Sequence, residues 1–209
     1  MLPKTFQNQP DAIASYDYVD IASGTGIVNF YAGNAASGSF LANYKWYSDT
    51  ICSLPGTPTN PISAVLDLDF DVLINKPFDI RGLSLVSVPL HTIGGEGVNT
   101  VYVKAKIRKW DGTTETEIAS NTSRTLTVAI SANIYQNLTI DINVPITHFK
   151  PGEYLRLTIE VWALGAAPGS ETIGHDPMAR LSGSAYWNTT GMTDIPSSLI
   201  FYVPRIIDI

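Results

Sequence analysis

The chain has 209 residues, of which 44% are hydrophobic and only 15% are charged, and its formal net charge is −6. A globule of this length buries about 70% of its unfolded surface, which is enough for a core without metal or disulfide cross-links. An acidic surface repels phosphates, so nucleic-acid binding is not expected. The single cysteine, Cys52, excludes an internal disulfide and any zinc site that needs several cysteines.

Signals that direct a chain to a membrane are missing from the sequence. No window approaches the roughly 20 apolar residues that cross a bilayer. The first ten residues, MLPKTFQNQP, lack a charged segment followed by an apolar run. We therefore expect a soluble protein, made without a signal peptide and without a membrane partner.

Residues 1–60 are rich in Gly, Ala, Ser, Asn and Tyr and contain one short strand pattern, at residues 26–31. This composition predicts a turn-rich, extended N-terminal arm. The segment PGTPTNP ends the arm, because proline fixes φ and disfavours helix at the preceding residue. We therefore divide the chain into an arm, residues 1–60, and a folded domain, residues 61–209.

The first strand of this domain, VLDLDFDVLI at residues 65–74, alternates apolar and acidic side chains. Successive side chains of a strand point to opposite faces. The apolar face comprises Leu66, Leu68, Phe70 and Val72. The opposite face comprises Asp67, Asp69 and Asp71, which we call the acidic row.

A basic counterpart follows in VYVKAKIRKW, residues 101–110. Its apolar face comprises Val101, Val103, Ala105 and Ile107. The opposite face comprises Lys104, Lys106 and Arg108, which we call the basic row. The Asp-Gly pair at residues 111–112 is a hairpin signal, so we expect residues 114–120, TETEIAS, to form the returning strand.

Five further segments have strand character: FDIRGLSLVSV, RTLTVAI, NLTIDINV, YLRLTIEVWA and the terminal LIFYVPRIIDI. Turn signals separate them, for example the Pro-Gly turn between Lys150 and Glu153. No segment has a helical period. About eight strands with long and short connections predict an all-β fold, an antiparallel β-sandwich of jelly-roll type with an extended N-terminal arm.

The acidic row allows three interpretations. Its carboxylates are ligands of the kind that calcium takes, which makes Asp67, Asp69 and Asp71 the calcium candidates of the chain. Alternate side chains of a strand lie about 6.6–6.8 Å apart, however, which is too far for all three to reach one ion. The second interpretation is pairing with the basic row, in the same subunit or across a subunit boundary, and the third is a solvated face. Exposed pairs add only about 0.2–1 kcal/mol each, so their use would be register and specificity.

The segment TIGHDPMAR, residues 172–180, places a histidine, an aspartate and an arginine within six positions. Adjacent strand residues point to opposite sides, so His175 and Asp176 would not bind one metal together, and Pro177 indicates a turn. We interpret the segment as a structural loop in which Asp176 accepts backbone N–H bonds and Arg180 binds a carboxylate. A metal or acid–base site of His175 and Asp176 is the alternative.

Aromatic side chains share a strand face with charged ones. Tyr154 and Trp162 lie on the face of their strand that carries Arg156 and Glu160. Such aromatics line the sugar-binding groove of a receptor module, or else pack in the core or at a subunit interface. The other aromatic candidates are Trp46, Trp110, Trp187, Tyr44, Tyr47 and Tyr186.

Motifs of catalysis and cofactor binding are missing from the sequence. It contains no G-x-S-x-G, no H-E-x-x-H and no P-loop. We therefore expect no catalytic residues, no cofactor and no resident metal, and a protein that is not an enzyme.

Three stretches, SYDYVDIASGTGIVNFYAG, GEYLRLTIEVWA with the following TIGHDPMAR, and the closing LIFYVPRIIDI, resemble a recurrent type of virion structural protein from tailed bacteriophages. This resemblance implies a jelly-roll subunit, usually oligomeric, that decorates or cements a capsid or lies at a head-to-tail or tail position.

From this resemblance we expect a capsid decoration or cement subunit, made in the host cytoplasm and located on the virion, at the capsid surface. Its partners would be the major capsid protein or other virion proteins, and further copies of itself. The expected contact residues are the acidic row, the basic row, Trp162, His175, Asp176 and Arg180. The alternatives are a carbohydrate-binding receptor module of a tail or fibre and a head–tail or neck structural protein.

Overall fold

The computed structural model describes residues 25–35, 38–44, 62–93, 99–129, 132–165, 170–173 and 199–206. All regular secondary structure in these residues is strand, which confirms the all-β class. The described residues include no helix that is long and apolar enough to span a bilayer.

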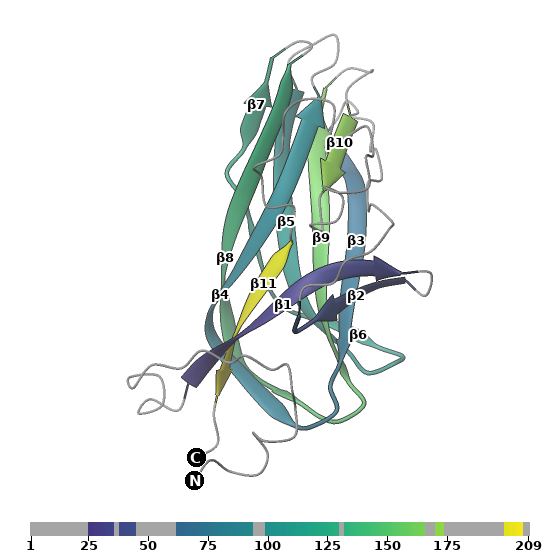
Figure 1. The fold of residues 1–209 in the computed structure, drawn as a ribbon, viewed down its shortest axis with the longest axis vertical. Coiled ribbons are helices and arrows are strands. Elements are labelled where there is room, and N and C mark those ends of the chain that lie inside the picture. The colour runs from purple at the N-terminus through teal and green to yellow at the C-terminus, as the bar shows by residue number, and fades with distance from the viewer. Residues whose placement is uncertain are drawn as a thin grey trace.

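Eleven strands make up the described part of the chain (Figure 1). They are β1 (Thr25–Ala35), β2 (Gly38–Ala42), β3 (Ser63–Leu73), β4 (Phe78–Ile93), β5 (Asn99–Trp110), β6 (Glu115–Thr122), β7 (Leu126–Val128), β8 (Asn133–Phe149), β9 (Tyr154–Leu164), β10 (Ser170–Ile173) and β11 (Ile200–Ile206). The turn signals fall between these strands as expected, because residues 111–114 join β5 to β6 and the Pro-Gly turn joins β8 to β9.

The strands form one sheet that folds over into two layers. Its order is β10-β4-β11-β1-β2-β3-β9-β5-β6, with β8 paired to β4 and β7 paired to β5. The ladders are antiparallel, except that a parallel bridge between Phe40 and Asp71 joins β2 to β3. The expectation of a wholly antiparallel sandwich therefore needs this one correction, at the strand pair that connects the two layers.

The two layers also approach each other at their other margin, between β6 and β8. The Asn121 side-chain amide donates to the Asp141 carbonyl oxygen at 2.6 Å. Close by, Arg124 donates to the Gln136 side chain at 2.9 Å. Side chains rather than a backbone ladder make these contacts, so the sheet nearly closes on itself.

The core lies between the two layers and is built by the two-residue period. The expected inward residues of β5 are fully buried, and so are those of β9. On β3, Leu66, Leu68 and Phe70 are buried and Val72 is partly buried, which confirms the expected faces of that strand. The largest buried side chains also include Phe149 and Phe201, which lie in the opposite layer.

Part of the expected N-terminal arm belongs to the sheet. β1 pairs with β11 from Thr25↔Ile206 to Tyr31↔Ile200, and with β2 from Tyr31↔Ala42 to Ala35↔Gly38. Phe30 and Leu41 of these two strands are buried in the core. The short strand expected at residues 26–31 thus lies within β1, in the middle of the sheet order.

Candidate interaction faces

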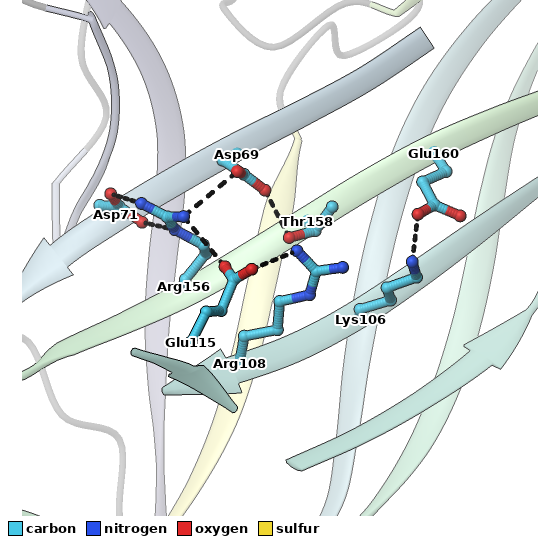
Figure 2. A network of polar contacts seen from close by, with 8 residues as sticks. All are labelled: Asp69, Asp71, Lys106, Arg108, Glu115, Arg156, Thr158 and Glu160. Carbon is cyan, nitrogen blue, oxygen red and sulfur yellow. Dashed lines mark hydrogen bonds and ion pairs between the residues drawn. The ribbon is translucent and has the colours of Figure 1, made fainter. Parts of the chain in front are cut away.

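The outward face of the layer β3-β9-β5-β6 gathers most of the charged candidates, and we call it the polar face (Figure 2). β9 lies between β3 and β5, so the acidic row and the basic row do not lie on neighbouring strands. Residues of β9 bridge them and carry both signs of charge. The cross-strand rows are Asp67–Glu160–Lys104, Asp69–Thr158–Lys106 and Asp71–Arg156–Arg108.

Arg156 is the centre of the network at one end of the polar face (Figure 2). Its Nε and Nη2 atoms donate to the two carboxylate oxygens of Asp71, each at 2.7 Å. Its Nη1 atom donates to Glu115 at 2.9 Å and lies 3.3 Å from Asp69. The bond to Asp71 is the largest reason that the pKa of Arg156 is raised. This bidentate geometry is the strongest form of a side-chain ion pair.

Glu160 is the centre of the network at the other end. Its side chain is held by the Lys106 ammonium on one oxygen and by Trp162 Nε1, at 2.9 Å, on the other. Only 6% of the residue is exposed, although it lies on the outward face. Burial raises the pKa of Glu160, but the bonds from Lys106 and Trp162 outweigh burial and lower the pKa. Glu160 is therefore a buried, ionised carboxylate with both oxygens paired.

Asp67 differs from its neighbours in the acidic row. Asp69 accepts a hydrogen bond from Thr158 and contacts Arg156, whereas Asp67 has no hydrogen bond or ion pair within the described residues. Partial burial and the charges of Asp69 and Glu160 raise its pKa. Asp67 thus carries an unpaired negative charge beside two others.

The calcium interpretation of the acidic row finds no support in this arrangement. Asp69 and Asp71 are bound to Arg156. In the described ranges, no group of three or more His, Cys, Asp or Glu side chains is placed to hold a metal ion. The Arg156 guanidinium thus takes the place beside these two carboxylates that a calcium ion would need.

Two aromatic pairs flank the charged network. Tyr102 and Trp162 are almost parallel, with an angle of 4° between the rings and centroids 6.1 Å apart. Trp110 and Tyr154 have centroids 5.0 Å apart, and the Arg156 guanidinium lies 4.7 Å from the Trp110 ring centre. Eight positions of β9 separate the two pairs, which is about 26 Å of strand. Tyr102 was not among the candidates, and only the pairing of β5 with β9 brings it to Trp162.

The outward face of the other layer carries an exposed apolar strip that sequence reasoning missed. Leu83 is 53% exposed, Leu85 is 36% exposed and Ile27 is 49% exposed. The ladders place Tyr202 beside Leu85 and Pro204 beside Ile27. We call these five residues, on β4, β11 and β1, the apolar strip, in which Tyr202 is half-buried and Pro204 is buried. Its signal in the sequence was weak, because LSLVSVPL gives hydrophobic residues to both faces of β4.

An exposed histidine–carboxylate pair was also missed. Asp79 Oδ1 lies 2.6 Å from His148 Nδ1, at the start of the β4–β8 ladder. No hydroxyl or thiol within the described ranges bonds to His148. The pair therefore joins two strands, and the described surroundings contain no nucleophile for acid–base chemistry.

Several candidates lie outside the described residues. These are His175, Asp176 and Arg180 of the expected loop, together with Cys52, Trp46, Tyr47, Tyr186 and Trp187.

No protein-family model matches the chain, and no curated protein is significantly similar to it. Solved structures are similar in fold. An aminopeptidase from a marine sediment archaeon, Thaumarchaeota archaeon, is 10% identical with a TM-score of 0.53, over 88% of this chain and 37% of that one. An α-amino acid ester hydrolase is 9% identical with a TM-score of 0.51, over 85% and 36%. A chain of infectious bursal disease virus, Gt strain, is 10% identical with a TM-score of 0.37, over 88% and 37%.

These comparisons contradict the expectation that the protein is not an enzyme. Hydrolases are among the structures that share its fold, and the chain spans little more than a third of their length. The lack of a short catalytic motif was poor evidence, because catalytic groups often come from distant strands and loops. At about 10% identity the likeness to the hydrolases shows the fold alone.

Proposed function

We propose that this protein is a structural subunit of a virus particle, and in particular a decoration or cement subunit on the capsid of a tailed bacteriophage. Its partners would be the major capsid protein or other virion proteins, together with further copies of itself. The proposal joins the sequence resemblance to the two outward faces of the sandwich.

The observation that carries the proposal is the apolar strip. Leu83 and Leu85 of β4 and Ile27 of β1 lie on the same face of the sheet, on either side of β11, and each exposes more than a third of its surface. Contiguous exposed apolar patches with polar surroundings mark sites of protein contact. The polar face supplies a second contact surface rich in Trp, Tyr and Arg, which are the residues that dominate interface energies. A subunit with two such faces is suited to bridging neighbours in a shell.

The direct experiment is co-sedimentation of the purified protein with capsid shells that lack it. We expect saturable binding with a fixed number of copies per shell. A variant with Leu83→Asp and Leu85→Asp should lose most of this binding, because charges cannot be buried against an apolar partner without cost. Wild-type protein that stays in the supernatant at every concentration would refute the proposal.

A glycan-binding module of a tail or fibre is the second candidate, and the near-parallel rings of Tyr102 and Trp162 favour it. Ring faces beside a polar group, here Lys104, are the usual elements of a sugar site. Binding of the protein to immobilised glycans, lost in Trp162→Ala and unaffected by the substitutions in the apolar strip, would select this candidate over the first.

A further inference from the structure

β3 lies between β9 and β2 in the strand order, but only part of its edge towards β2 is paired in the described sheet. It is paired with β9 from Ser63 to Leu73. On its other side, the single bridge between Phe40 and Asp71 joins it to β2. Over residues 64–69 the described strands therefore leave the outward backbone N–H and C=O groups of β3 without a ladder. Such an edge is a template for an added strand.

A second copy of the same edge is a poor occupant. Two β3 edges side by side would bring two acidic rows together, and like charges on neighbouring strands are destabilising. The β3–β9 register also shifts between Ala64 and Leu66, which is an irregularity of the bulge kind. Charged side chains and bulges are the usual protection of an edge against self-pairing.

The charges on the face beside this edge are not balanced. Asp67 has neither a hydrogen bond nor an ion pair within the described residues. Partial burial raises the pKa of Asp67 most, and the carboxylates of Asp69 and Glu160 raise it further. The positive charges of Arg108 and Lys106 offset this rise only in part. A cation that arrives from outside the sheet would remove this repulsion. Arg156 already neutralises the charge of Asp71 in this way.

We propose that the edge of β3 binds an extended, basic segment of a partner protein as an additional strand, with Lys or Arg at alternate positions facing Asp67 and Asp69. The intervening residues of the segment would be apolar, because they would lie beside Leu66 and Leu68 at the rim of the core.

The test uses the full chain and a capped, fluorescein-labelled peptide of sequence Thr-Lys-Val-Lys-Val-Lys-Thr. Fluorescence anisotropy should show saturable binding that weakens at high salt. Hydrogen exchange should show slower exchange of those amides of residues 64–69 that do not bond to β9 when the peptide is bound. Asp67→Asn should weaken binding by about two- to fivefold, as expected for one exposed ion pair.

Two controls separate strand addition from simple charge attraction. Asp141→Asn removes an exposed carboxylate of the other layer and should leave the affinity unchanged. Two further peptides, with N-methyl groups on both valines or on the first two lysines, keep every charge, and the one whose methylated N–H groups face β3 should not bind. Unchanged binding of both methylated peptides, or protection of amides elsewhere than in β3, would overturn the proposal. So would protection, in the free protein, of the amides of residues 64–69 that do not bond to β9, because another segment or a second copy would then occupy the edge.

Discussion

Glu160 shows at the scale of one residue how the polar face is held together. Its carboxylate is nearly buried and is paired with Lys106 and Trp162. We expect Glu160→Ala to lower the free energy of unfolding by about 1–3 kcal/mol, because it leaves the half-buried indole N–H of Trp162 and the Lys106 ammonium without their acceptor. Urea denaturation measures this loss, and Glu117→Ala, at an exposed position of β6, is the control. A loss no larger than that of the control would show that the Glu160 contacts add nothing.

The same residue predicts a pH dependence. The pKa of Glu160 is lower in the folded protein than its ordinary value of 4.5. Its contribution to stability is therefore fully present above pH 4.5 and is lost as the pH falls through the lower pKa of the folded state. Wild-type protein and Glu160→Gln should accordingly converge in stability at the acid end of a pH series of urea denaturations. A difference between them that stays constant to the lowest pH would contradict this assignment.

For Asp67 we expect the opposite effect of pH on the free energy of unfolding. Its pKa is raised in the folded protein, so its charged form costs stability at neutral pH and costs none below the ordinary value of 3.8, where it is neutral in both states. Because the side chain is exposed, we expect Asp67→Asn to stabilise the protein by only about 0.2–1 kcal/mol at pH 7. Thermal denaturation at pH 7 and at pH 3 checks this. A variant that is less stable at pH 7 would show that Asp67 has a partner.

At the scale of the element, β4 depends on a glycine. Gly82 has φ +114° and lies where the registers with both β8 and β11 shift. A Cβ atom there would meet only Pro204, at an ordinary distance of 3.7 Å. Gly82→Ala should therefore cost about 1–3 kcal/mol through backbone strain and not through a clash. An unchanged denaturation midpoint would show that β4 relaxes to another backbone conformation at no cost.

The sequence predicted single strands and hairpins better than it predicted the order of the strands in the sheet. The two-residue alternation of β3 and β5 predicted which side chains are buried, because local backbone geometry alone decides it. The Asp-Gly hairpin was equally local, since Asp111 accepts the backbone N–H groups of Thr113 and Thr114. The sequence could not predict that β9 lies between β3 and β5. For that reason the partner of Asp71, Arg156, 85 positions away, was not foreseen.

At the scale of the whole molecule, the apolar strip predicts self-association. We expect sedimentation velocity to show a defined oligomer that becomes smaller when Leu83 and Leu85 are both replaced by aspartate. Leu73→Asp is the matched control, because Leu73 is 44% exposed but lies on β3 in the other layer. If the wild-type protein is a monomer at high concentration, the strip does not join copies of this chain.

A cryo-EM reconstruction of the particle that contains this protein would test directly whether it is a capsid subunit. We expect the sandwich in repeated positions on the capsid. The apolar strip should be buried against a neighbouring chain. A particle in which the protein occupies no regular position, or in which the strip and the polar face both remain open to solvent, would contradict the account.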